Sequence, residues 1–263
     1  MGSAAPSTNS SSDGKGYSHK AVARSTDRGD SWTRVSEDLT RNLNRDSLPI
    51  MGLSGPGGFG RHEGTAEFGN IATIDESPLR RGLLYVGTDD GVVQVTRDGG
   101  RNWTRIDRFP GVPDMTYVSR VVASAHNEGT LYVTFDGHRS NDFNAYVLKS
   151  TDYGRSFTSL ADDLREAGSV YVIREHPRNP DLLVVGAEYG VFVSVNGGRT
   201  WAQLANGIAP APVHDLVIHP RDNDLVVGTH GRSGMARLAL GSTASAVIER
   251  APRSVLVVRL ALS

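Results

Sequence analysis

Four polar residues stand at one equivalent position in consecutive repeats of the sequence: Asp89, Asp136, Glu188 and His230. Each follows a short apolar run with the composition of a buried strand. Glycoside hydrolysis uses two carboxyl groups, about 5–5.5 Å or 6.5–9.5 Å apart, and the three acids of this set could supply such a pair. Acidic residues are also common in solvated turns, so the sequence leaves a plain turn role open for all of them.

Further polar residues are expected to reach the same place. Three lie in the first strand expected in their repeats, and one follows His230 in the last repeat. Together with His230, the candidate ligand-binding residues are Arg120, Tyr171, His214 and Arg232.

Glu67 is a further candidate acid. It closes a Gly-rich segment, residues 49–69, that runs directly into the strand expected at 71–74. Long loops between strands often carry functional side chains. A surface insertion without contact to the site is the alternative.

An eight-residue phrase occurs four times, at 25–32, 96–103, 150–157 and 194–201, in the form Ser/Thr-x-Asp/Asn-x-Gly-x-polar-aromatic. The Asp or Asn can accept hydrogen bonds from backbone N–H groups ahead of it, and the Gly can adopt positive φ. The aromatic side chain can bury an apolar face under the turn. We call these segments the repeat turns and expect a structural role for their key residues, Asp27, Trp32, Asp98, Trp103, Asp152, Phe157, Asn196 and Trp201.

The repeat turns set the organisation of the chain. They are 71, 54 and 44 residues apart (98 − 27, 152 − 98 and 196 − 152), and a unit of roughly 40–50 residues is typical of a four-stranded propeller blade. The predicted divisions are a disordered leader (1–16), a half blade (17–48), a loop (49–69), three blades (70–107, 117–160 and 168–205), a partial blade (212–240) and a tail or extra strand (241–263).

The sequence therefore predicts an all-β fold, a β-propeller of four-stranded antiparallel blades. The half blade and the partial blade could close a small ring of four, but small propellers are uncommon, so an open, partial propeller is favoured. In a propeller, equivalent turns gather at one end of the axis. We call the end that carries the turns after the second strands the axial face.

Composition excludes several classes of function. The formal net charge of −1 gives no basic field for nucleic acid. No apolar run reaches the roughly 20 residues of a membrane span, and no signal peptide is visible. The eight histidines lack the spacing of a metal site. We expect no metal and no cofactor.

The sequence resembles bacterial proteins described as BNR-repeat (Asp-box) glycosyl hydrolases, which are also called sortilin-N-terminal-domain-like. The resemblance rests on Ile74–Pro78, Tyr85–Val93 and Thr96–Gly100, and on the closing Gly228–Ser233. It covers roughly residues 21–232, which is most of the chain. It implies Asp-box hairpins at the rim, an extracellular or periplasmic location, and a longer parent protein with further blades.

Two functions remain open at this stage. One is a carbohydrate-active or carbohydrate-binding module whose axial face holds a glycan. The other is a propeller that binds a polypeptide at the same face without catalysis.

Overall fold

The computed structural model describes residues 19–44, 48, 68–204, 210–220, 224–229 and 255–259. The predicted leader, residues 49–67 of the predicted loop and residues 241–254 of the tail lie outside this part. The described residues form β-strands joined by turns, with a single short 3₁₀ helix, η2 (His138–Ser140).

Three complete sheets each contain four antiparallel strands in sequential order. This order is what a chain of hairpins produces, since antiparallel neighbours need only short connections. The strands are β3 (Ile71–Glu76), β4 (Leu84–Thr88), β5 (Val93–Thr96) and β6 (Thr104–Ile106); β7 (Tyr117–Ala123), β8 (Leu131–Asp136), β9 (Tyr146–Ser150) and β10 (Thr158–Ser159); β11 (Val170–His176), β12 (Asn179–Ala187), β13 (Gly190–Ser194) and β14 (Ala202–Gln203).

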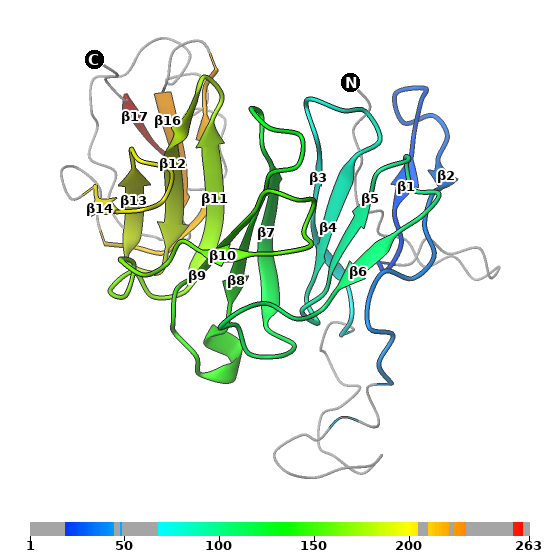
Figure 1. Cartoon of the computed structure of the whole chain (residues 1–263), viewed down its shortest axis with the longest axis horizontal. Helices are drawn as coiled ribbons and strands as arrows, with labels where there is room; N and C mark the ends of the chain where they lie inside the picture. The colour runs from blue at the N-terminus through cyan, green and yellow to red at the C-terminus, as the bar shows by residue number, and fades with distance from the viewer. Residues whose placement is uncertain are drawn as a thin grey trace.

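Smaller sheets flank these three. At the N-terminal end, β1 (Ala23–Arg24) pairs with β2 (Thr33–Arg34). At the C-terminal end, β15 (Val213–Ile218), β16 (Asp224–Thr229) and β17 (Val255–Arg259) form an antiparallel sheet. The predicted all-β fold of four-stranded antiparallel sheets is confirmed, and a partial propeller is consistent with the arrangement of the sheets in Figure 1.

The sheets pack face to face through apolar side chains. One core cluster joins Tyr85 and Val93 of the first complete sheet to Val121 and Phe135 of the second. Similar clusters join the second sheet to the third and the third to β15 and β16. Strands buried on both faces explain why the sequence reads as continuous apolar runs rather than as an alternating pattern.

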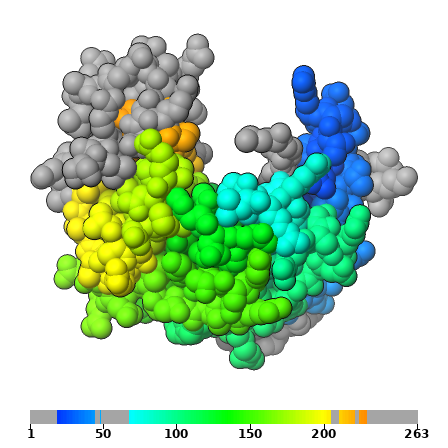
Figure 2. Space-filling model, turned by 45° about the horizontal axis from the view of Figure 1, so that its top comes forward, coloured from blue at the N-terminus to red at the C-terminus, as the bar shows by residue number. Residues whose placement is uncertain are grey.

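The space-filling view shows the described blades as an arc around a hollow (Figure 2). The N-terminal residues and the C-terminal strands lie on the two arms of this arc. No helix in the described ranges is long and apolar enough to cross a membrane.

The first strand of each complete sheet, and of the C-terminal sheet, carries a register shift at the same place. The pairing skips one residue between Ile71 and Thr73, between Val118 and Arg120, between Val170 and Val172, and between Val213 and Asp215. The skipped residues are Ala72, Ser119, Tyr171 and His214. A bulge bends the strand and re-aims its side chain, which matters because two of these four residues are candidate ligand-binding residues.

The repeat turns share one hydrogen-bond pattern. Oδ1 of Asp27, Asp98 and Asp152 accepts the backbone N–H four residues on at 2.9 Å, and Asn196 does so at 3.0 Å. The hydroxyl that opens each phrase also accepts the N–H of the Gly, at 2.7–2.9 Å. Each Gly has positive φ, and so does the residue before it. This geometry agrees with the structural role expected for the Asp and Asn residues.

The aromatic residues of the repeat turns are less uniformly buried than the sequence predicts. Trp201 is buried, and its indole N–H donates to the carbonyl of Leu160 in the preceding sheet at 2.8 Å. Trp32, Trp103 and Phe157 are only partly buried. The aromatic residues of these three turns therefore keep part of their surface exposed, whereas that of the fourth is buried.

Candidate functional site

The candidate site lies where the first strands of the sheets begin and the second strands end. β7 begins opposite the end of β8, because Tyr117 pairs with Asp136, and Val170 pairs with Ala187 in the next sheet. The repeat turns join the third and fourth strands, so they lie at the opposite end of the sheets. This is the axial face that the sequence predicts, away from the repeat turns.

Tyr171 and His214 meet at this face. Their rings stack with centroids 4.2 Å apart and an angle of 28° between planes. Arg120 donates from Nη2 to the backbone oxygen of His214 at 3.4 Å. Three of the five predicted ligand-binding residues are thus brought together, from three different sheets. The bulges at Tyr171 and His214 explain how adjacent first strands turn these two rings towards each other.

Glu188 accepts a hydrogen bond from the hydroxyl of Tyr171. Burial, followed by this bond to the carboxylate, raises the pKa of Tyr171 far above its ordinary value. Tyrosine serves as the nucleophile in some glycosidases. Here the phenol is only 8% exposed and its raised pKa keeps it protonated, so both its accessibility and its acidity work against that role.

Asp136 is held by a neighbouring histidine. Its two carboxylate oxygens lie 2.7 and 2.6 Å from Nδ1 of His138, and Oδ1 also accepts the His138 backbone N–H at 3.0 Å. The His138 ring lies edge-on to Tyr171, with centroids 6.4 Å apart. Asp136 therefore stands at the edge of the Tyr171–His214 pair, and its carboxylate is engaged in its own turn.

Asp89 organises the backbone beside it. Its Oδ1 accepts the backbone N–H groups of Gly69 and Asn70 at 2.9 and 2.6 Å. Burial raises the pKa of Asp89 despite these bonds. The carboxylate is thus committed to fixing the entry into β3, which is a structural use of the position.

Two charged residues of the axial face were not predicted. Arg174 of β11 and Asp215 of β15 join Arg120 in an ion cluster, in which Nη2 of Arg120 and Nη2 of Arg174 lie 3.1 and 3.3 Å from Oδ1 of Asp215. Neither residue belongs to a motif. The sequence signal that could have identified them is a charged residue in a strand expected to be buried. Such residues are usually paired with another charge or have a function.

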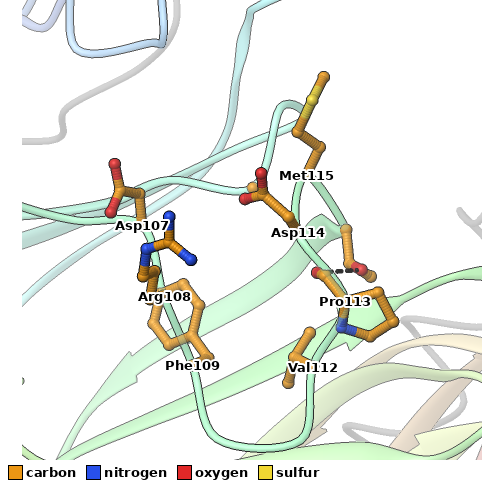
Figure 3. A pocket seen from close by; sticks show the side chains of 9 residues that line it. Asp107, Arg108, Phe109, Val112, Pro113, Asp114 and Met115 are labelled. Carbon is orange, nitrogen blue, oxygen red and sulfur yellow. Dashed lines mark hydrogen bonds between the residues drawn. The ribbon is translucent and has the colours of Figure 1, made fainter.

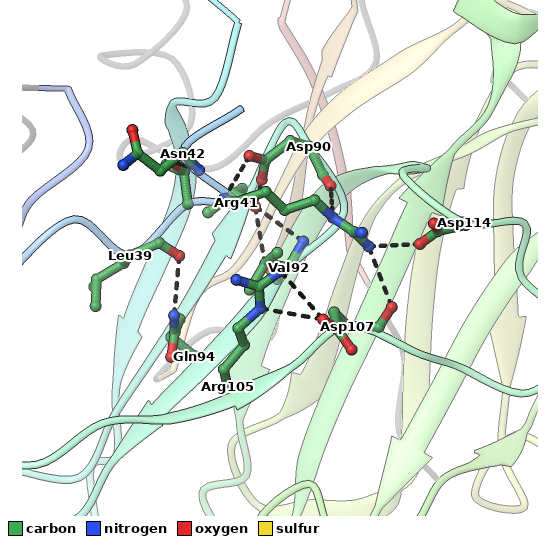
Figure 4. A network of polar contacts seen from close by, with 11 residues as sticks. Leu39, Arg41, Asn42, Asp90, Val92, Gln94, Arg105, Asp107 and Asp114 are labelled. Atoms are coloured by element: carbon green, nitrogen blue, oxygen red, sulfur yellow. Dashed lines mark hydrogen bonds and ion pairs between the residues drawn. The ribbon is translucent and has the colours of Figure 1, made fainter. Parts of the chain in front are cut away.

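A second polar network surrounds Arg41, which also was not predicted (Figure 4). Its backbone N–H donates to Oδ2 of Asp90 at 2.7 Å and its Nε to the Asp90 carbonyl at 2.8 Å. Its Nη2 lies 2.5 Å from Oδ1 of Asp114. The network ties Arg41 to the turn after β4 and to the loop between β6 and β7.

A cavity of about 110 Å³ lies beside this loop (Figure 3). It is lined by Gly91 and by residues 107–109 and 112–116. None of the predicted site residues lines it. Its walls come largely from one loop, so it is separate from the Tyr171–His214 pair.

Three predicted site residues, Glu67, His230 and Arg232, lie outside the described residues. Within the described ranges, no group of three or more His, Cys, Asp or Glu side chains is arranged to hold a metal ion.

Comparison with solved structures supports the propeller fold. The chain is similar to an ancestral GH74 enzyme, with 16% identity and a TM-score of 0.54 over 80% of this chain and 25% of that one. It also matches the GH74 xyloglucanase of Xanthomonas campestris (16% identity, TM-score 0.49, 60% of this chain and 26% of that one). YCF48 bound to a D1 peptide matches at 17% identity and a TM-score of 0.45, over 60% of this chain and 47% of that one. The chain spans about a quarter of the two GH74 proteins and about half of YCF48.

Comparison with family models gives one match, to the Universal stress protein family, over residues 208–259. It covers about a fifth of the chain, including the closing Gly228–Ser233 motif on which part of the resemblance to BNR-repeat proteins rests. No curated protein matches the chain.

Proposed function

We propose that the axial face binds a glycan and does not hydrolyse it. The observation that carries this proposal is the stacked pair of Tyr171 and His214, with Glu188 on one side and Arg120 on the other. A sugar ring presents an apolar C–H face and a rim of hydroxyl groups. Aromatic rings beside a few fixed polar groups match both features.

Tyr189 is the contact residue that the glycan would meet first. It follows Glu188 directly, and its side chain is 52% exposed, in contrast to the buried ring of Tyr171. The Tyr189 carbonyl accepts a hydrogen bond from Gln203 Nε2 at 2.8 Å, which holds the turn in place. An exposed ring on a fixed turn loses little conformational entropy on binding.

Binding without hydrolysis follows from the state of the acids. Asp89 is bonded to backbone N–H groups, Asp136 to His138, and Glu188 to Tyr171. A general acid must reach the glycosidic oxygen, and the second carboxyl must reach the anomeric carbon or a water. Each acid would have to leave a protein partner before it could act.

The test is a titration of the purified chain with neutral and acidic oligosaccharides, followed by calorimetry of those that bind. Tyr189→Ala is expected to weaken binding because it removes the exposed ring that contacts the sugar. Glu188→Gln is expected to weaken binding about tenfold or more, since a hydrogen bond to a charged group contributes about 1.5–3 kcal/mol. Val195→Ala is the control, because Val195 is exposed in a repeat turn at the other end of the sheets.

Three results would overturn the proposal. The first is that no oligosaccharide binds. The second is release of new reducing ends during incubation, which would indicate a hydrolase. The third is a peptide ligand, selected from a library, whose binding is weakened by Tyr189→Ala to the same extent. That result would favour the polypeptide-binding alternative.

A further inference from the structure

The axial ion cluster joins three first strands of the propeller. Arg120 comes from β7, Arg174 from β11 and Asp215 from β15, and both guanidinium groups contact the same carboxylate oxygen, Oδ1 of Asp215. Arg120 therefore reaches past the intervening strand β11 to a residue two sheets away. The glycan-binding proposal uses neither Arg174 nor Asp215.

In direct contact, two guanidinium groups share the single carboxylate of Asp215. The other acid that acts on both arginines is Asp75, whose Oδ2 accepts the backbone N–H of Ala123 at 2.8 Å. Burial raises the pKa of Asp75. Nε of Arg120 is buried and has no hydrogen-bond partner among the described residues.

All three members of the cluster also bond to the backbone, since Oδ1 of Asp215 accepts the Leu216 N–H at 3.0 Å. Nε of Arg174 donates to the Leu216 carbonyl at 2.7 Å, and Arg120 donates to the His214 carbonyl. The side chains of both arginines are 27% exposed, whereas that of Asp215 is 59% exposed. Asp215 is thus the exposed member of the cluster, so a ligand from solvent can reach the place of its carboxylate.

We infer that Arg120 and Arg174 form an oxyanion-binding site in which the Asp215 carboxylate occupies the place of the ligand. A carboxylate, sulfate or phosphate group displaces the Asp215 carboxylate. It then accepts hydrogen bonds from the two Nη2–H groups that now contact Asp215. Arginine suits this task because its planar fork of donors matches the oxygens of such groups.

This inference deepens the proposed function, because an anion bound here lies beside the Tyr171–His214 pair. It would make the favoured glycan an acidic one, with a carboxylate or a sulfate ester. It can be tested without any glycan, so the failure of one proposal does not entail the failure of the other.

The experiment is a titration of the whole chain with sodium sulfate, sodium phosphate and sodium acetate at constant ionic strength, followed by calorimetry and by thermal unfolding. Comparison of the three anions distinguishes the preferred oxyanion. The variants are Arg120→Met, Arg174→Met and Asp215→Asn. Arg80→Met is the control, because Arg80 pairs with Glu128 away from the axial face.

Arg120→Met and Arg174→Met are expected to weaken anion binding at least tenfold, and Arg80→Met to leave it unchanged. Asp215→Asn is expected to strengthen binding about three- to tenfold, because it removes the carboxylate that the anion must displace. Weaker binding in Asp215→Asn, or equal losses in Arg120→Met and Arg80→Met, would overturn the inference. Circular dichroism of each variant separates loss of the site from loss of the fold.

Discussion

The ring of Tyr171 stacks on the ring of His214 at a centroid distance of 4.2 Å, although the two residues belong to different sheets. Both are the skipped residue of a bulge in the first strand of their sheet. The pair therefore connects two neighbouring blades at the axial face, and each of its residues lies at an equivalent bulge.

This coupling is measurable in a double-mutant cycle. Tyr171→Leu, His214→Ala and the double variant are compared by urea unfolding at pH 8. Stacked rings contribute about 0.5–1.5 kcal/mol beyond the area that they bury. The double variant should therefore lose less stability than the sum of the two single losses, by that amount. Additive losses would show that the rings do not interact in solution.

The aromatic residues of the repeat turns should differ in their contribution to stability. Trp201→Ala is expected to lower the free energy of unfolding by about 3–5 kcal/mol, the range for a buried large aromatic. Trp103→Ala should cost less, about 1–3 kcal/mol, because part of its ring is exposed. Urea unfolding of both variants tests the order. The account would be contradicted by equal losses.

The glycine at the fifth position of the repeat turns should be sensitive to the sheet before it, except in the first turn. A Cβ added to Gly100 would lie 2.4 Å from the Val35 carbonyl oxygen, and one added to Gly198 would lie 2.8 Å from Cδ1 of Leu160. At Gly29 a Cβ would meet nothing within 4 Å among the described residues. All three have positive φ, so Gly29→Ala controls for backbone strain.

Gly29→Ala should therefore cost about 1–2 kcal/mol from strain alone. Gly100→Ala should cost a further 1–3 kcal/mol, roughly, from overpacking. Thermal and urea unfolding of the two variants measure the difference. If Gly29→Ala destabilises the chain as much as Gly100→Ala, Gly100 does not hold the contact between sheets.

The repeat turns predict a dependence of stability on acidic pH. Hydrogen bonds from Asn102 to Asp98 and from Ser156 to Asp152 lower the pKa of each carboxyl from 3.8 to about 2. A depressed pKa in the folded state means that the stabilisation is complete above the unfolded value and is lost as the pH falls. The loss should therefore occur between about pH 4 and pH 2.

Asn196 shows how to test this dependence, because it makes the equivalent bond to the Thr200 N–H without a titrating group. Asp98→Asn and Asp152→Asn should keep most of their stability at pH 7 and lose stability less steeply from pH 4 to pH 2. Urea midpoints across that range measure the effect. Unchanged slopes in both variants would mean that these carboxyls do not titrate in the predicted window.

The sequence predicts the repeat turns well because their geometry is local. The Asp acceptor and the Gly with positive φ lie within eight residues, so spacing alone fixes them. The Ser or Thr at the first position belongs to the sequence pattern, but the hydrogen bond that its hydroxyl accepts from the Gly N–H was not predicted. The partial exposure of Trp103 depends on the neighbouring sheet and could not be read from the phrase itself.

The axial face was predicted only in part, for a physical reason. Aligning the repeats correctly grouped Arg120, Tyr171 and His214 because equivalent strands begin at the same end. The contact between Arg120 and Asp215 depends on the angle between sheets, which no local pattern encodes. Asp89 was expected to face a ligand, but its neighbours Gly69 and Asn70 present backbone donors that the sequence does not reveal.

The central claim, that a glycan binds at the axial face, is tested most directly by hydrogen–deuterium exchange with and without the oligosaccharide that binds best in the titration. The account predicts slower exchange at residues 187–189 and 213–216, and no change in the repeat turns at 96–103 and 150–157. Slower exchange in the repeat turns with none at 187–189 would place the ligand at the opposite end of the sheets and contradict the claim.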